Sequence, residues 1–260
     1  FLEVLPSAKN IVAVGSGKGG VGKSTVAVNL ASALSILGGK VGLLDADIYG
    51  PSVSMMLKTS HKPIVVGEKI LPMKSNGIHY ISMGFLVEEE TPIIWRGPLV
   101  SRAIEQLLSE VEWPDLDYLI VDLPPGTGDA QLTICQRVPL TGAVIVSTPN
   151  DVALATAKRG LVMFEKMNVP ILGIIENMSY FICPHCGKES EIFSKGMAET
   201  EAKNMGIPCL GKIPIESKVA ESGEKGIPIV NLYPSSETAK AFLTAGQSLS
   251  QEISKINLKG

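Results

Sequence analysis

The chain has 260 residues, of which 45% are hydrophobic and 19% are charged, and its net charge at pH 7 is −3. This length suits one α/β domain with a large core, and the charge balance excludes a strongly basic nucleic-acid or membrane surface. Nothing resembles a signal peptide, and no apolar run approaches the roughly 18 residues of a transmembrane helix. We therefore expect a single domain over residues 1–260, without nucleic-acid binding or stable membrane insertion.

Cysteine usage and the chain start bear on the compartment. The four cysteines, two of them isolated, do not form a disulfide framework, which favours a reducing interior compartment. The chain begins at Phe1 rather than Met, and we expect that an N-terminal portion precedes it.

A glycine-rich stretch near the start carries the strongest motif. Residues 14–25 fit the phosphate-binding pattern G-x-x-x-x-G-K-[ST], between an apolar strand at 11–14 and a helical period at 24–37. Backbone N–H groups of such a loop point at phosphate oxygens, Lys23 meets the terminal phosphates, and Ser24 binds Mg²⁺. The predicted nucleotide contacts in this loop are Gly17, Lys18, Gly19, Gly20, Val21, Gly22, Lys23, Ser24 and Thr25.

An extra lysine, Lys18, follows the first glycine of this pattern. A loop lysine is usually a solvated surface charge, but a second cation beside the phosphates would stabilise transition-state charge as an arginine finger does. The version G-K-G-G-V-G-K-S resembles the deviant P-loop ATPases, among them the nitrogenase iron protein and the MinD/ParA partition ATPases. That resemblance implies that Lys18 acts across a dimer, in the partner's nucleotide site.

Two carboxylates follow a second apolar strand at 41–44. Asp45 and Asp47 lie at the carboxyl end of this strand, where ligands bind in parallel sheets. The alternative is that one of them caps the helix after Pro51. We expect Asp45 to contribute to the nucleotide site and Asp47 to orient the attacking water.

A small β insertion is predicted at about 58–95. It comprises a hairpin at 63–73 and a further strand at 78–85, which interrupt the strand–helix alternation. His61 and His79 stand alone in it and are expected to be surface or packing residues.

A third buried strand at 119–122 closes on Asp122, in the Walker B arrangement. It follows a predicted helix that ends near residue 111. With Ser24, Asp122 is expected to hold Mg²⁺, and Gly126 gives the following loop freedom to move when the γ-phosphate leaves. A strand that ends in aspartate is weak evidence alone, but with the upstream loop it indicates nucleotide hydrolysis.

Two more strands are predicted at 143–146 and 171–175, separated by a helix at 152–167. The second strand is followed by E-N-M-S, in which Asn177 either caps the next element or reads the adenine edge. The deviant P-loop ATPases have a base-reading asparagine at this strand end, so the resemblance implies adenine recognition.

The segment C-P-H-C places Cys183 and Cys186 in a tight turn, where both thiols can bind one soft metal centre. One chain offers only half of a tetrahedral thiolate set. Cys135, in a predicted helix, and Cys209, at a strand start, are expected to be buried small hydrophobes. His185 is expected to be a solvent-facing turn residue.

The remaining elements complete a doubly wound, mostly parallel α/β sheet of the P-loop NTPase type, with a last strand at 210–213 and a closing helix at 236–256. A membrane-targeting helix would need a basic polar face, and this helix has only Lys240 and Lys255. We expect its apolar side to pack on the sheet.

Five motifs together resemble the Mrp/ApbC iron–sulfur cluster carrier ATPases and a related mitochondrial assembly factor for respiratory complex I, over about residues 7–230. They are D-A-D-I-Y-G-P-S (45–52), W-R-G-P (95–98), D-L-P-P-G-T-G-D (122–129), E-N-M-S (176–179) and C-P-H-C (183–186). The resemblance implies a cytoplasmic or mitochondrial-matrix homodimer that holds a [4Fe–4S] cluster on paired Cys183 and Cys186. It also implies use of ATP and Mg²⁺ in cluster transfer to apoproteins.

Two other functions compete with this interpretation. A partition or positioning ATPase would bind membrane or DNA and would not need Cys183 and Cys186. A zinc-stabilised nucleotide switch would use the same cysteines for a structural metal. We favour the cluster carrier, because C-P-H-C follows E-N-M-S.

Overall fold

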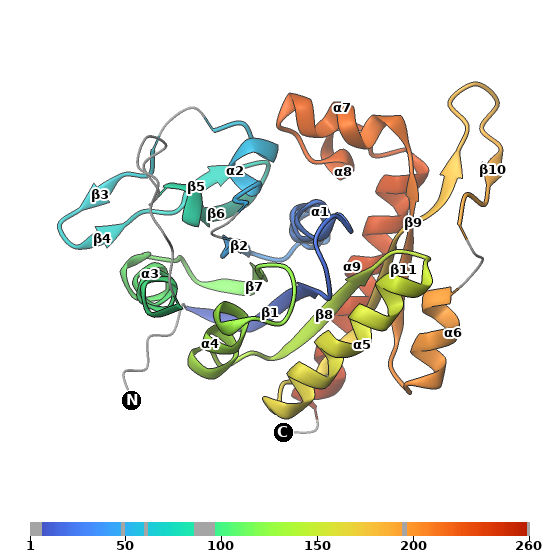
Figure 1. Ribbon diagram of the computed structural model, residues 1–260. Helices are drawn as coiled ribbons and strands as arrows, with labels where there is room; N and C mark the ends of the chain where they lie inside the picture. Colours follow the sequence, from blue (N-terminus) through green and yellow to red (C-terminus); the bar gives the residue numbers. More distant parts are fainter. Residues whose placement is uncertain (1–6, 48–49, 60–61, 86–96, 194–196, 259–260) are drawn as a thin grey trace.

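A mostly parallel sheet with helices on both faces forms the body of the protein (Figure 1). The computed structural model describes residues 7–47, 50–59, 62–85, 97–193 and 197–258. Within them the sheet has nine strands, ordered β10-β9-β8-β1-β7-β2-β6-β5, with β11 also paired to β9. Its strands are β1 (Ala8–Ser16), β2 (Val41–Asp45), β5 (Met73–Ser75), β6 (Ile78–Ser82), β7 (Leu116–Asp122), β8 (Gly142–Ser147), β9 (Ile171–Ile182), β10 (Glu189–Ser190) and β11 (Cys209–Ile215).

The central strand β1 is buried on both faces of the sheet. It pairs in parallel with β7 and β8, and its side chains alternate between two cores. Ile11 and Ala13 contribute to one core, whereas Val12 and Val14 contribute to the other. This arrangement confirms the predicted doubly wound, mostly parallel α/β fold.

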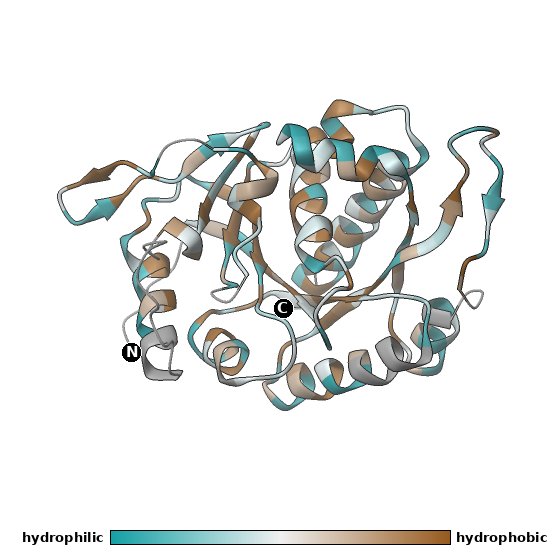
Figure 2. Cartoon of the chain, turned by 45° about the horizontal axis from the view of Figure 1, so that its top comes forward, coloured by the Kyte–Doolittle hydropathy of each residue, from teal (hydrophilic) through white to brown (hydrophobic). Residues whose placement is uncertain are grey.

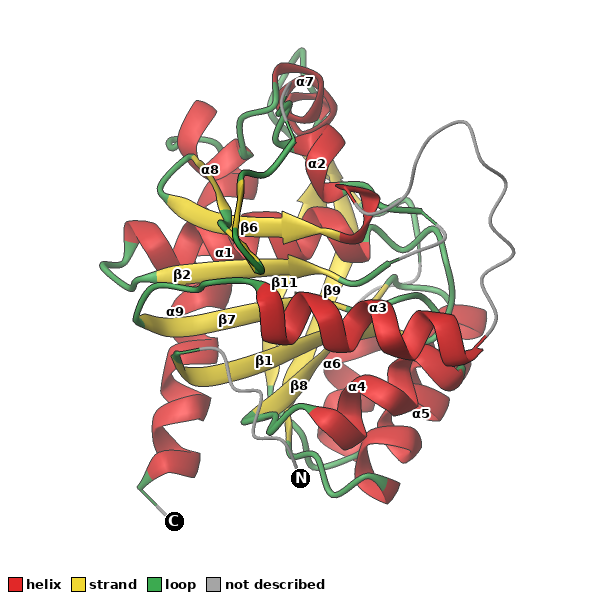
Figure 3. Ribbon diagram, turned by 90° about the vertical axis from the view of Figure 1, so that its left-hand side faces the viewer, coloured by secondary structure: helices red, strands yellow, loops and turns green. Residues whose placement is uncertain are grey.

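The helices form two layers, one against each core. Helices α3 to α6 contribute to one core, and α1, α2, α8 and α9 contribute to the other; Figure 3 shows α3, α4 and α5 on the near side of the strands. The helices are α1 (Lys23–Ile36), α2 (Val53–Met56), α3 (Gly97–Glu110), α4 (Asp129–Arg137), α5 (Asp151–Lys166), α6 (Met197–Asn204), α7 (Ser217–Lys225), α8 (Ile229–Leu232) and α9 (Glu237–Asn257).

The closing helix α9 packs on the sheet as predicted. Its first turn is capped by Ser236, whose hydroxyl accepts a hydrogen bond from the backbone N–H of Ala239. Phe242, Leu249 and Ile253 on its inner face are buried. Among the described residues, no helix combines the length and the apolar character that crossing a membrane requires.

Strand register gathers acidic residues at one edge of the sheet. Asp122, the last residue of β7, lies beside Val14 of β1 and beside Asp45 of β2. Asp45 in turn lies beside Ser82, the last residue of β6. Because these strands are parallel, their carboxyl ends meet at the loop that precedes α1.

The predicted end of the strand at residue 175 is wrong. Strand β9 continues to Ile182, because its outer part pairs antiparallel with β10, and Phe181 also aligns with Ile215 of β11. The polar residues Glu176 and Asn177 interrupt the apolar run in the sequence and hide this continuation. The turn that carries Cys183 and Cys186, here named the cysteine turn, therefore lies at the end of a strand that begins in the core.

The predicted insertion lies partly in the main sheet. Its hairpin, β3 (Val65–Val66) with β4 (Lys69–Ile70), forms a separate two-stranded unit, and Figure 2 shows the hydrophobic β3 on this outlying arm. Strand β6, however, pairs in parallel with β2 and extends the central sheet. The strand predicted at 78–85 ends at Ser82, and a short 3₁₀ turn, Met83–Phe85, follows it.

Three predictions about isolated or motif residues meet different outcomes. His79 is half-buried, and burial lowers its pKa, with a further contribution from Lys74. This agrees with a packing residue. His61 lies outside the described residues, as do the first two residues of the W-R-G-P motif, 95–96.

Candidate functional site

The loop between β1 and α1 has the backbone of an anion-binding site. Gly20 and Gly22 have φ angles of 80° and 77°, a left-handed conformation that glycine adopts without a steric cost. Gly22 is the N-cap residue of α1, and no side chain caps this helix. Its first N–H groups therefore point into the loop with the positive end of the helix dipole.

A cavity of about 220 Å³ lies over this loop. It brings together most of the loop residues predicted to contact a nucleotide with Asp47, which follows β2. It is lined by Ser16, Lys18, Gly19, Gly20, Gly22, Lys23, Ser24, Thr25, Asp47, Ser52, Met56 and Pro125. Lys18 is half-buried at this cavity, so its placement differs from that of a fully solvated surface lysine.

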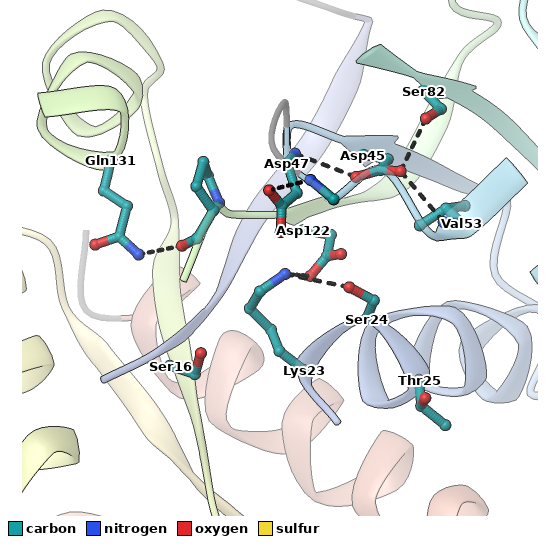
Figure 4. Close-up of polar contacts among 12 residues, drawn as sticks. Ser16, Lys23, Ser24, Thr25, Asp45, Asp47, Val53, Ser82, Asp122 and Gln131 are labelled. Atoms are coloured by element: carbon teal, nitrogen blue, oxygen red, sulfur yellow. Dashed lines mark hydrogen bonds and ion pairs between the residues drawn. The ribbon is translucent and has the colours of Figure 1, made fainter. Parts of the chain in front are cut away.

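Lys23 and Asp122 form a buried ion pair beneath the cavity. The ammonium lies 2.5 Å from Oδ1 of Asp122 and 3.3 Å from the hydroxyl of Ser24 (Figure 4). Only 6% of the Lys23 side chain is exposed, and Asp122 is fully buried. The two predicted phosphate and Mg²⁺ residues thus neutralise each other here, a contact that the sequence does not reveal.

The carboxylate of Asp122 has one oxygen atom that could bind a cation. Burial raises the pKa of its carboxyl, and Lys23 opposes this effect. Its second oxygen, Oδ2, is buried and has no hydrogen-bond partner among the described residues. An uncompensated carboxylate oxygen near the hydroxyl of Ser24 is the oxygen donor set that Mg²⁺ prefers, so these residues fit the predicted ion.

Asp45 is a fully buried carboxylate that organises the end of β2. It accepts hydrogen bonds from the backbone N–H groups of Asp47 (3.1 Å) and Val53 (3.2 Å) and from the hydroxyl of Ser82 (2.8 Å). Burial, followed by repulsion from Asp122, raises its pKa to about 7. Because Val53 begins α2, Asp45 makes the helix-capping contact that was the alternative for this residue, and it does not line the cavity.

Asp47 faces the cavity that Asp45 does not reach. It is buried, lines the cavity, and accepts a hydrogen bond from the backbone N–H of Gly50 at 3.2 Å. Its position beside the glycine-rich loop of residues 14–25, the P-loop, suits a side chain that orients a water molecule. That role of Asp47 stays a prediction. The two residues that follow it, 48–49, lie outside the described residues.

The loop after Asp122 is tied to the end of β1. The backbone N–H of Gly126 donates to the carbonyl of Ser16 at 3.0 Å, and Gly126 has a left-handed φ of 93°. The side chain of Gln131 donates to the carbonyl of Pro124. Sequence reasoning missed Ser82 and Gln131, because register and loop packing bring them to the site rather than a motif.

Asn177 contacts the P-loop directly. Its side-chain N–H donates to the carbonyl of Val21 at 2.9 Å. The alternative that it caps the following element does not hold, because Asn177 lies inside β9. Adenine recognition by this amide stays a prediction.

The cysteine pair lies on the turn between β9 and β10. The backbone closes this turn with hydrogen bonds from Cys183 N–H to the Lys188 carbonyl and from Gly187 N–H to the Cys183 carbonyl. Cys183 is half-buried and Cys186 is exposed. Hydrogen bonds from backbone N–H groups lower the pKa of the Cys183 thiol, and the largest contribution comes from the N–H of His185. The lowered pKa favours the thiolate, which is the form that binds metals.

The other cysteines have a different environment. Cys135 is buried in α4, and burial raises its pKa to about 11. Cys209 is half-buried at the start of β11, and its pKa is also raised by burial. Within the described part of the chain, no group of three or more His, Cys, Asp or Glu side chains is placed to hold a metal ion. The turn therefore offers two thiols.

Proteins of known family are similar to this chain over most of its length. The chain is 52% identical over 257 residues to an iron-sulfur cluster carrier protein of Aquifex aeolicus, covering 97% of this chain and 71% of the relative. It is 53% identical over 252 residues to the iron-sulfur cluster transfer protein NUBPL of Dictyostelium discoideum, covering 96% and 78%.

A solved structure with a similar fold is a nucleotide-binding protein of Archaeoglobus fulgidus in complex with ADP. It has a TM-score of 0.75 and 40% identity, over 85% of this chain and 87% of that one. Residues 7–250 match the family described as ParA: NUBPL iron-transfer P-loop NTPase. The chain therefore belongs to the ParA/NUBPL family of iron-transfer P-loop NTPases.

Proposed function

We propose that this protein is an ATP-hydrolysing iron–sulfur cluster carrier that holds a [4Fe–4S] cluster between two copies and transfers it to apoproteins. The observation that carries the proposal is the cysteine turn, which presents two thiols at the outer end of a strand whose inner part contacts the P-loop. A [4Fe–4S] cluster takes four thiolates, so two identical turns complete its ligand set.

The residues of the nucleotide site support hydrolysis of the phosphoanhydride bond between the β- and γ-phosphates of ATP. Loop N–H groups and the start of α1 bind the phosphates, and Lys23 leaves Asp122 to meet them. Ser24 and Asp122 would hold Mg²⁺, which when bound neutralises charge on the phosphates. Asp47 orients a water molecule that attacks the γ-phosphorus; the bond to the bridging oxygen breaks, and ADP and inorganic phosphate leave. Lys18 of the second copy stabilises the transferring group.

The cluster is the cargo of this carrier. Its place on an exposed turn favours transfer to another protein, because neither thiol is enclosed by the core. The expected recipients are apo iron–sulfur proteins. The compartment stays a prediction, the cytoplasm or, as the alternative, the mitochondrial matrix, and subcellular fractionation tests it.

Anaerobic reconstitution tests this proposal. Purified protein is treated with iron and sulfide, its absorption and EPR spectra are recorded, and iron, sulfide and zinc are counted per dimer. We expect a [4Fe–4S] spectrum that is lost in the Cys183→Ser, Cys186→Ser double variant and retained in Cys209→Ser, the matched control. Added apo-[4Fe–4S] enzyme should gain activity. Zinc without sulfide would instead support a structural metal, and normal iron and sulfide in the double variant would refute the assigned ligands.

A further inference from the structure

Strand β9 contains a backbone distortion between the P-loop and the cysteine turn. Met178 has a φ of 57°, in the left-handed region that side chains other than glycine and asparagine rarely occupy. The pairing with β11 is irregular at the same place, because Asn177 aligns with Ile213 whereas Phe181 aligns with Ile215. Such bulges bend a strand, and strained residues concentrate where a structure switches.

Side chains on both sides of this bend hold it in place. Asn177 donates to the carbonyl of Val21, while on the other side Ser179 donates to the buried carboxylate of Glu176 at 2.5 Å. Gly22 packs closely against the same segment. A Cβ atom at this position would clash with the side-chain amide nitrogen of Asn177 and would lie 3.7 Å from the terminal methyl of Met178. The bend is therefore in contact with the part of the P-loop that a nucleotide would bind.

The bend divides β9 into an inner part that is paired along both of its sides and an outer part that shares only one aligned residue with β11. The inner part is paired on both sides, with β8 as far as Glu176 and with β11 as far as Asn177. The outer part pairs with the short strand β10 at Phe181 and Ile182, its one aligned residue in β11 is Ile215, opposite Phe181, and Cys183 follows it directly. A change in the backbone at Met178 would therefore reorient the cysteine turn while the inner strand stays fixed in the sheet.

We propose that Met178 is a strained hinge through which nucleotide binding at the P-loop changes the position of the cysteine turn. A nucleotide displaces the Asn177 amide from Val21, and without that contact Met178 relaxes from the left-handed conformation. The outer part of β9 then moves with Cys183 and Cys186. This inference rests on the proposed function only in giving the moved cysteines a cargo.

Thiol labelling of metal-free protein tests the hinge without a cluster. Iodoacetamide modification of Cys183 and Cys186 is followed by mass spectrometry, with no nucleotide and with saturating MgADP, which fills the P-loop without a γ-phosphate. We expect MgADP to change the labelling rate about fivefold or more, within the usual range of coupling between sites. Asn177→Ala without nucleotide should label at the rate of the liganded wild type.

Two glycine variants separate the hinge from a general change in flexibility. Met178→Gly makes the left-handed conformation unstrained, so the ratio of rates with and without MgADP should fall to about one. Asn168→Gly is the matched control, because Asn168 also has a left-handed φ, 56°, but lies before the other end of β9; it should keep the wild-type ratio.

Two results would overturn the hinge: a ratio near one in the wild type, or a wild-type ratio in Met178→Gly. Circular dichroism establishes that each variant is folded. Because iron and sulfide binding is measured separately, a protein that takes no cluster yet shows the labelling pattern refutes the carrier function and leaves the hinge intact. The reverse pattern refutes the hinge alone.

Discussion

The P-loop and the cysteine turn differ in how much of each site one chain supplies. At the P-loop, the lysine, the serine and the strand-end aspartate form an interlocked and largely buried group. On the turn, two thiols lie half-buried or exposed and lack further ligands among the described residues. In the proposed carrier, nucleotide binding is thus built into the monomer, whereas cluster binding depends on a second copy.

The proposed role of Lys18 in the pocket of a second copy would make the nucleotide site depend on a dimer as well. Lys18→Ala should retain ATP binding and lower the hydrolysis rate by about 10³-fold, the lower range for an arginine finger. Mixed dimers of one Lys18→Ala and one Lys23→Ala subunit are then assayed. The Lys18→Ala subunit keeps an intact Lys23 in its own pocket, and the Lys23→Ala subunit keeps an intact Lys18. If Lys18 acts in trans, the second subunit supplies it to the pocket of the first, so about half of wild-type activity remains. Near-complete inactivity would assign Lys18 to its own pocket.

Lys23→Ala removes both a phosphate ligand and the counter-ion of Asp122. We expect ATP affinity to fall at least about 100-fold, as loss of a charge-assisted contact worth roughly 3 kcal/mol implies. The free energy of unfolding should also fall by about 3 kcal/mol, because a buried carboxylate loses its partner. Isothermal titration and urea unfolding measure the two effects.

The Lys23→Ala, Asp122→Asn double variant controls this result. With the carboxylate gone, most of the lost stability should return, while ATP binding stays weak. If the double variant is as unstable as Lys23→Ala, the ion pair does not explain the loss.

Asp45 makes the free energy of unfolding of the protein depend on pH. Its folded pKa of about 7 lies above that of an unfolded aspartate, so its protonation stabilises the fold fully below about pH 4, and this contribution disappears as pH rises through 7. Asp45→Asn should remove this decline, which amounts to at most ~1.4 kcal/mol per pH unit. Urea unfolding between about pH 4 and pH 8, a range that spans the unfolded and folded pKa values, measures it.

Asp117→Asn is the control of opposite sign. Hydrogen bonds from the backbone N–H of Lys40 and from Lys9 lower the pKa of Asp117, so its carboxylate stabilises the fold at neutral pH. This variant should lose stability at neutral pH and match the wild type in acid. An unchanged pH profile in Asp45→Asn would contradict the raised pKa.

Ser82→Ala should have the smallest effect. It removes the hydroxyl that donates to Asp45 at 2.8 Å, and a buried hydrogen bond of this kind contributes about 1 kcal/mol or somewhat more to unfolding free energy. Ser75→Ala, on the neighbouring strand β5, is a serine control away from the aspartates. Equal losses in the two variants would show that the contact with Asp45 has no specific role.

The parts of the fold and site that could be predicted are those encoded locally. The strand, glycine loop and helix around Lys23 follow one another in the sequence, and so do the apolar strand and Asp122 that closes it. The two cysteines are likewise three residues apart. Each of these patterns predicts a chemical role from neighbouring residues alone, without information on distant segments.

What could not be predicted depends on pairing between distant segments. The length of β9 follows from its pairing with β10 and β11, and the place of β6 follows from its pairing with β2. The contact of Asp45 with Ser82 requires that strand register, and the contact of Asn177 with Val21 requires the P-loop to lie against β9. Tertiary structure sets these contacts, and the residues involved carry no motif for them.

The central claim is that two copies of the cysteine turn share one cluster, and anaerobic native mass spectrometry of the reconstituted protein tests it most directly. The account predicts a dimer that carries the mass of one [4Fe–4S] cluster, with dimer and cluster lost together when an iron chelator is added or when Cys183 and Cys186 are replaced by serine. A metal ion or cluster bound to each monomer, or a cluster-bearing dimer of the serine variant, would contradict it.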